Sequence, residues 1–177
     1  MKTQKSPYQR KIYVAVYSSE EIKRSERIEE FSPRYDGESL ESWVANLVSQ
    51  LRMLGSNEVL LVGEIPPVAI EFWSNRSSSM AVIIGSRRSH YLASHSELEE
   101  LEQILILSLL DPDEVHSNAS DPLMAIVYRR LDSEFYIRIA LLISEDAARQ
   151  NSVISARLAR EKEVERGRAR GRLKWKK

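Results

Sequence analysis

The sequence lacks cysteine altogether, and this absence removes several kinds of chemistry. A chain without thiols forms no disulfide, holds no thiolate zinc site and has no cysteine nucleophile. A reducing compartment is compatible with such a composition. Long apolar runs are also missing, because the stretch Ile12 to Tyr17 is too short for a signal-peptide core or a membrane span. We therefore expect a cytoplasmic protein that does not contact membranes.

The short motifs that mark many enzymes are missing too. The sequence contains no Walker-type phosphate loop, no GxGxxG, no HExxH, no GxSxG and no EF-hand loop. Carboxylates are numerous, but most lie in runs that are typical of a solvated helix face, such as the one from Glu97 to Glu102. We therefore assign no metal site and expect no cofactor.

Charge is balanced over the whole chain but unevenly distributed along it. Residues 157–177 hold ten of the 26 basic residues and three of the 26 acidic ones, so this segment carries +7 and the remainder −7. Such an asymmetry predicts a C-terminal arm that contacts a polyanion. The polyanion is either nucleic acid, an acidic partner or an acidic face of the same molecule. Because Gly167 and Gly171 disfavour a rigid helix, we expect the arm to be flexible.

The apolar pattern predicts an α+β fold in two parts. Residues 1–75 indicate a β-α-β module, with a strand from Lys11 to Ser18, an amphipathic helix over residues 39–54 that Ser39 caps, and a strand from Glu58 to Ile65. A short helix after Ser18 also fits the pattern. This module either adds strands to the sheet of the second part or binds a partner.

Residues 76–177 predict a second α+β unit that ends in the basic tail. The polar run Asn75 to Ser79 separates it from the first part. A strand over MAVIIG and a loop over SRRSHYLASH precede a capping box at Ser96, from which we expect a helix to Leu110. Three further strands form an antiparallel meander, with the helix packed on one face of the sheet. They span Met124 to Arg130, Phe135 to Ile143 and Ser152 to Leu158.

The side chains that remain for chemistry are three histidines, two arginine pairs and small hydroxyls. The histidines are His90, His95 and His116, the pairs are Arg87-Arg88 and Arg129-Arg130, and Ser155 lies on the last predicted strand. A lone histidine is usually structural, and His95 directly precedes the helix cap. The arginine pairs are equally explained as surface charges or salt bridges. Taken separately, none of these residues identifies a site.

The order of segments from about Ser79 to Trp175 is informative as a whole. It comprises a strand and loop ending in His95, a helix from Glu97, the exit LLDPDEVHSNASDP, the strands MAIVYRR and FYIRIALLI, and SVISARLAREKEVERGRARGRLKW. This order resembles the nuclease superfamily that groups barnase, EndoU, the colicin-type tRNases and RelE-like toxins, in particular its phage-associated and cyanobacterial members. Those members typically show His-Pro-Glu-Leu at the helix start, and here Ser96 replaces the proline. Their Tyr-Tyr-Arg-like strand has a single tyrosine here, Tyr128.

The resemblance implies metal-independent RNA cleavage by attack of a 2′-hydroxyl on the adjacent phosphate. It implies that His95 is the general acid or base, with His90 as the alternative. Arg129 or Arg130 would hold the phosphate, and Ser155 would donate a hydrogen bond to it. The predicted nucleic-acid contacts are Arg157, Arg160, Arg166, Arg168, Arg170, Arg172, Lys174 and Trp175.

The first hypothesis is thus a toxin-like ribonuclease, for which a protein inhibitor is a possible partner. Two other functions remain open. The first is a non-catalytic RNA-binding or other nucleic-acid-binding protein that uses the same sheet and tail. The second is an interaction protein whose tail docks on an acidic partner or folds back on its own body. His95 together with Arg129 favours cleavage, whereas the scarcity of aromatic residues for base stacking, with Trp175 the main candidate in the tail, counts against simple binding. The missing proline before Glu97 slightly favours the interaction protein.

Overall fold

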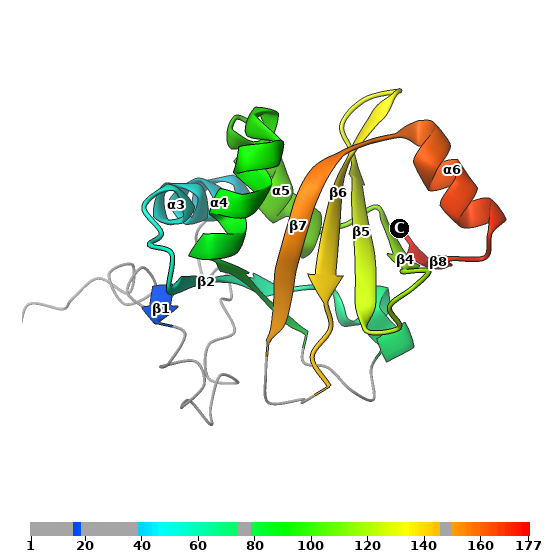
Figure 1. Ribbon diagram of the computed structural model, residues 1–177, viewed down its shortest axis with the longest axis horizontal. Helices are drawn as coiled ribbons and strands as arrows, with labels where there is room; N and C mark the ends of the chain where they lie inside the picture. Colours follow the sequence, from blue (N-terminus) through cyan, green and yellow to red (C-terminus); the bar gives the residue numbers. More distant parts are fainter. Residues whose placement is uncertain (1–15, 19–38, 74–78, 146–149) are drawn as a thin grey trace, which may run out of the picture.

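The computed structural model describes residues 16–18, 39–73, 79–145 and 150–177 (Figure 1). These residues form an eight-stranded sheet with the strand order β1-β2-β3-β7-β6-β5-β4-β8, and the predicted α+β class is confirmed. The strands are β1 (Val16–Ser18), β2 (Glu58–Glu64), β3 (Met80–Ile84), β4 (Glu114–Ser117), β5 (Met124–Arg130), β6 (Phe135–Leu142), β7 (Asn151–Arg160) and β8 (Leu173–Lys176). The α-helices are α3 (Leu40–Arg52), α4 (Gly85–Ser94), α5 (Glu102–Leu110) and α6 (Glu161–Ala169), and the 3₁₀ helices are η2 (Pro67–Trp73) and η3 (Ser96–Glu99).

The sheet is mixed, which corrects the expectation of a purely antiparallel one. Strands β3 and β7 pair in parallel through Ala81 and Asn151, because the chain returns to β3 after the β4-β5-β6 meander in the direction that β3 runs. All other neighbouring strands pair antiparallel, β1 with β2 included. The predicted order of strand, helix and strand is present as β1, α3 and β2, but the two strands pair antiparallel and not in parallel. Residues 11–15 and the helix expected after Ser18 lie outside the described residues.

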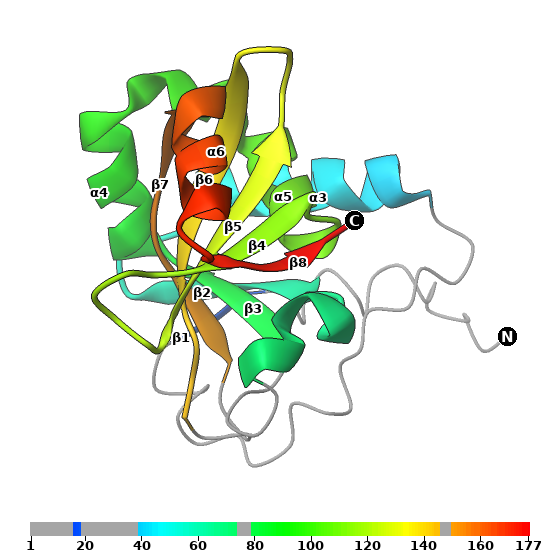
Figure 2. The same ribbon diagram turned by 90° about the vertical axis from the view of Figure 1, so that its right-hand side faces the viewer.

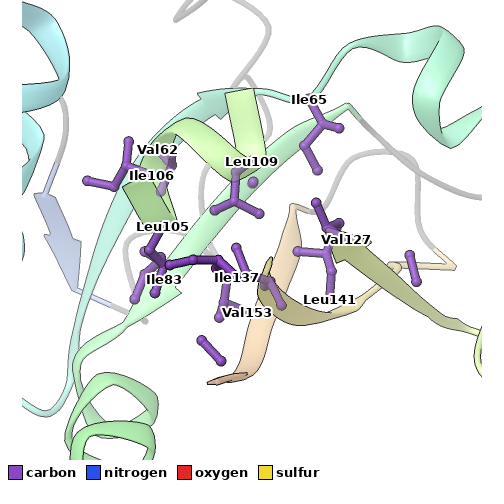
Figure 3. Close-up of a cluster of buried hydrophobic side chains, with 14 of the residues drawn as sticks. Val62, Ile65, Ile83, Leu105, Ile106, Leu109, Val127, Ile137, Leu141 and Val153 are labelled. Atoms are coloured by element: carbon purple, nitrogen blue, oxygen red, sulfur yellow. The ribbon is translucent and has the colours of Figure 1, made fainter. Parts of the chain in front are cut away.

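The two faces of the sheet pack against different helices. Leu105 and Leu109 of α5 contact the face that carries Val127, Ile137 and Leu141 (Figure 3). Figures 1 and 2 show α3 and α5 on this side of the sheet and α6 on the other side. The second face buries a smaller cluster that consists of Ile126, Tyr128, Tyr136, Ala140, Ala159 and Val164. We call these the α5 face and the α6 face.

The segment before α5 differs from the sequence prediction. The predicted loop SRRSHYLASH forms most of α4, whose buried residues are Gly85 and Tyr91. With only two buried positions, the helix has no regular spacing of apolar residues by which it could be predicted from the sequence. The single helix expected from Ser96 is divided, because Ser96–Glu99 forms a 3₁₀ turn without a side-chain cap and α5 begins at Glu102.

The basic tail is folded, so the expectation of a flexible arm is wrong. Its first half is α6, and its second half is β8, which pairs antiparallel with β4 through Trp175 and Val115. Gly171 has φ +70 and follows the helix end. Its N–H donates to the Arg168 carbonyl at 3.0 Å and the Arg172 N–H donates to the Gly167 carbonyl at 3.0 Å, the two bonds of a Schellman motif. Gly171 therefore ends α6, and Gly167 is buried within it.

No helix in the described part of the chain has both the length and the apolar character that a membrane crossing requires.

Candidate nucleic-acid interface

Helix α6 presents two faces of different character. Val164 is fully buried and Gly167 is buried, so this side of the helix lies against the α6 face of the sheet. Glu161, Glu163 and Arg168 flank the contact and form ion pairs with residues of the sheet or with one another. The opposite side of α6 faces away from the sheet.

A charged cluster joins the inner side of α6 to β4. The Arg168 Nε atom donates to both carboxylate oxygens of Glu114, at 3.1 and 2.9 Å. The Arg168 Nη1 atom lies 3.3 Å from Glu161 Oε1. His116, two residues after Glu114 on the same side of β4, places Nε2 at 2.9 Å from Glu114 Oε2. Arg168 is thus neutralised by the body of its own fold.

Burial and hydrogen bonding set the charges of this cluster. Burial lowers the pKa of His116 below its usual value and outweighs the hydrogen bond to Glu114, which alone would raise it. Burial alone would raise the pKa of Glu114, but hydrogen bonds from Arg168 and His116 outweigh it and hold that pKa below its usual range. The buried carboxylate is therefore ionised and the buried imidazole is neutral near neutral pH.

A shallow pocket of about 300 Å³ lies beside this cluster. Its lining residues are Asp113, Glu114, Arg130, Tyr136, Arg168, Lys176 and Lys177. All four lining cations have carboxylate partners: besides Arg168, Arg130 Nη2 lies 2.6 Å from Glu161 Oε2, Lys176 Nζ lies 3.5 Å from Glu114 Oε1, and Lys177 Nζ lies 2.8 Å from Asp111 Oδ2. Arg130 also donates to the Tyr136 hydroxyl. The pocket therefore carries little uncompensated charge.

The outer side of α6 and the following turn carry cations of a different kind. Lys162, Arg166 and Arg170 are exposed at a spacing of four residues, so they form one row along the helix. Arg160 is exposed at the end of β7, where α6 begins, and Arg172 (half-buried) and Lys174 (exposed) follow the helix. Within the described ranges, none of these six side chains has a carboxylate within ion-pair distance. We call these six residues the basic stripe. It also borders Glu165, the exposed carboxylate on this side of α6.

The structure divides the nucleic-acid contacts predicted from sequence into two groups. Arg157 pairs with Glu163 at 2.7 Å, Arg168 pairs with Glu114 and Glu161, and Trp175 packs against the main core. The other predicted contacts, Arg160, Arg166, Arg170, Arg172 and Lys174, belong to the basic stripe. Sequence reasoning missed Lys162, although its spacing from Arg166 and Arg170 would have identified it once the tail was taken as a helix.

Two of the predicted catalytic side chains lie on opposite faces of the sheet. Arg129 pairs with Ile137, which belongs to the α5 face, whereas Ser155 pairs with Ala140, which belongs to the α6 face. Successive residues of a strand point to alternate faces, so Arg129 and Ser155 point away from each other. The Arg129 guanidinium instead lies 3.2 Å from Asp111 Oδ2, at the end of α5.

Arg130, the alternative phosphate ligand, shares the α6 face with Ser155 but not its neighbourhood. Arg130 pairs with Tyr136, and Tyr136 pairs with Ala159, four residues from Ser155. Four residues of extended strand correspond to roughly 13 Å. One phosphate therefore does not contact both side chains as they stand.

The two histidines of the predicted site lie on and after α4. His90 is exposed on the helix, and His95 is its C-cap, with Nδ1 at 3.5 Å from Glu97 Oε1. The third histidine, His116, is buried beneath α6. Glu114 and His116 escaped notice as a pair, although their alternation along β4 was visible in the sequence. Among the described side chains, no group of three or more histidine or carboxylate residues is placed to hold a metal ion.

Comparisons of this chain with protein-family models, with curated proteins and with solved structures found no match.

Proposed function

We propose that this protein binds the sugar-phosphate backbone of a nucleic acid through the basic stripe, with RNA as the first candidate. One observation carries the proposal. The described cations of the tail that face the body are neutralised by it, whereas the six cations of the stripe, five exposed and Arg172 half-buried, have no acidic partner among the described residues. Uncompensated cations in a row are the electrostatic footprint of a phosphate-binding surface. The preference for RNA rests on the resemblance to RNA-cleaving proteins.

The dimensions of the stripe suit several phosphates. Lys162 to Arg170 spans eight residues of helix, or roughly 12 Å at 1.5 Å per residue. Arg172 and Lys174 extend the cationic surface past the end of the helix onto β8. Long flexible side chains on such a scaffold follow a charged backbone but do not present the fixed donor patterns that read base edges. We therefore expect binding with little sequence preference.

The composition of the stripe favours nucleic acid over an acidic protein. Protein interfaces have an apolar centre that is depleted of charged residues. The large exposed hydrophobic residues of the described chain are Leu40, Met53, Val68, Phe72 and Leu142, and none of them lies on α6. The outer side of α6 therefore lacks the apolar centre that a protein partner would need.

The test is the salt dependence of affinity. The substitutions Lys162→Gln, Arg166→Gln and Arg170→Gln together should weaken the binding of single-stranded RNA. They should also reduce the slope of log affinity against log salt by roughly 2, since each contact to a single strand contributes about 0.7. Fluorescence anisotropy with a labelled oligonucleotide measures both quantities. Glu165→Gln removes a carboxylate from the same surface and should strengthen binding.

The matched control is Arg87→Gln, which removes an exposed cation from α4. Its effect should be smaller than that of Arg166→Gln, which also removes one charge. Equal effects of these two substitutions would mean that the stripe is not the binding surface. A wild-type protein that binds no nucleic acid at low salt would contradict the proposal as a whole.

Metal-independent cleavage of the bound RNA is a second candidate, and the pocket favours it. Arg130, Arg168 and Lys176 surround the Glu114 carboxylate and the Tyr136 hydroxyl there, on the face of the sheet that α6 covers. Such groups stabilise a developing phosphorane and transfer protons. Their present ion pairs would have to open when a phosphate enters the pocket.

A further inference from the structure

Phe72 is an exposed aromatic side chain that packs against a buried one. It lies in η2 with 60% of its surface exposed, while the next residue, Trp73, is buried with 4% exposed. The two rings pack edge to face, with centroids 4.9 Å apart. The indole Nε1 of Trp73 donates to the Pro122 carbonyl at 2.9 Å, and this hydrogen bond fixes the position of the buried ring. The exposed ring of Phe72 therefore packs against a neighbouring ring that is itself buried and hydrogen-bonded.

The ring lies next to the basic stripe. The Lys174 ammonium sits 4.6 Å from the centroid of the Phe72 ring and donates to the Gly171 carbonyl at 3.4 Å. This places Phe72 beside the turn that carries Arg170 and Arg172. Figure 2 shows β8 crossing the side of the molecule that faces the viewer, with the end of α6 above it and η2, against which β8 packs, below it. An exposed aromatic platform thus adjoins a row of cations that have no acidic partner among the described residues.

We propose that Phe72 is a stacking platform for one unpaired nucleobase, flanked by Lys174. This inference rests on the proposed function and specifies the ligand, which is single-stranded nucleic acid. When a base stacks on the ring, the Lys174 ammonium moves from the ring to a neighbouring phosphate. The lysine side chain is exposed, and a cation–π contact at an exposed site is weak, so the exchange costs little.

The charges around the ring favour a base over an apolar side chain of a protein partner. A nucleotide brings a π-face together with a negative charge, and the site offers a ring together with Lys174, Arg170 and Arg172. Glu71, exposed on η2, is the acidic neighbour along the chain. Base–aromatic stacking tolerates any base, because every base has a π-face. In a duplex both faces of an internal base are already stacked, so we expect a preference for single strands.

The experiment compares two oligonucleotides on matched variants. The first is a labelled single-stranded RNA of about twelve nucleotides, within the usual site sizes. The second has the same backbone but lacks the bases. Phe72→Leu, which keeps the bulk and removes the ring, should weaken binding of the first roughly tenfold and leave binding of the second unchanged. Phe72→Tyr keeps the ring and should retain the affinity.

The control is Val68→Ala, which alters the other exposed apolar side chain of η2 and should not change binding. Wild-type affinity for both oligonucleotides in Phe72→Leu would overturn the platform. If the stripe variant Lys162→Gln, Arg166→Gln, Arg170→Gln still weakens binding in that case, the proposed function stands without the platform. Equal weakening for both oligonucleotides would also overturn it, because a loss that ignores the bases is not stacking. Failure of the wild-type protein to bind either one would remove the proposed function and the platform together.

Discussion

At the scale of single residues, Gly167 decides how closely α6 approaches the sheet. A Cβ atom on this glycine would lie 2.6 Å from His116 Nδ1 and 3.0 Å from His116 Cε1. The imidazole has little room to retreat, because it is buried and its other nitrogen is held by Glu114. The absence of a side chain at position 167 therefore allows the helix to dock directly on β4.

We predict that Gly167→Ala destabilises the protein. In a free helix this substitution is favourable by up to about 1 kcal/mol. Here the contact with His116 should outweigh that gain, and overpacking of this kind typically costs about 1–3 kcal/mol. Urea denaturation measures the change, with Arg166→Ala as the control because Arg166 is exposed. A more stable Gly167→Ala protein would show that α6 does not rest on His116.

At the scale of secondary-structure elements, the sequence predicted best where packing is expressed as a local pattern. The apolar spacing of α3 and the β-branched runs of β2, β3, β5 and β6 were readable, because each of these elements buries a regular set of its own side chains. Helix α6 buries Val164 and Gly167 only, so its sequence resembles a solvated charged arm. Ion pairs to the sheet help to hold it, such as the pair of Arg168 with Glu114, whose partners are 54 positions apart.

The candidate interface shows the same limit. The excess of cations in the tail was visible in the sequence, but which of them remain available depends on their partners. Arg166 and Arg168 are two positions apart, yet one faces solvent and the other is paired in the cluster on β4. Phe72 had no signal at all, because its exposure and its contact with Lys174 join segments about 100 residues apart along the chain. Such long-range pairing cannot be derived from composition or periodicity.

The docking of α6 predicts a stability that falls in acid. His116 is neutral in the folded protein, because burial lowers its pKa below the usual 6.5, and it recovers the usual pKa on unfolding. The unfolded chain therefore binds more protons, and stability decreases as the pH falls below about 6.5. Glu114 adds a further loss below about 4.5, because its folded pKa is also below the usual value.

Urea denaturation at several pH values between about 8 and about 5 tests this dependence. His116→Gln keeps a polar side chain but removes the titrating group, so its curve should be flatter than that of the wild type over this range. Parallel curves for the two proteins would show that the charge state of His116 does not contribute to the docking of α6.

At the scale of the whole molecule, the charge asymmetry of the sequence serves two purposes. Part of the positive tail is attracted to the negative body and completes the sheet as α6 and β8. The rest is held on the outside by that docking and forms the basic stripe. Folding back and binding a polyanion, which the sequence presented as alternatives, are therefore compatible. Truncation of the tail would remove a strand and an interface together, so only substitutions on the outer surface separate the two roles.

The two faces of the sheet offer different places for cleavage of RNA. We expect any ribonuclease activity to persist in EDTA and to survive His95→Ala, because His95 does not line the pocket on the α6 face. A fall of about a hundredfold in kcat in His95→Ala, the range usual for loss of a general acid or base, would instead place the reaction at His95. Arg130→Ala should lower kcat strongly, because Arg130 lines the pocket on the α6 face, next to Tyr136 and Arg168.

Arg129→Ala is the matched control for Arg130→Ala, since the adjacent residue on the same strand points to the α5 face and pairs with Asp111. Its kcat should remain near that of the wild type, and thermal melting should show that both variants are folded. A loss of activity in Arg129→Ala with normal activity in Arg130→Ala would move the reaction to the α5 face. In that case the surface that binds RNA and the site that cleaves it would lie on opposite faces of the sheet, and α6 would serve only to bind the RNA.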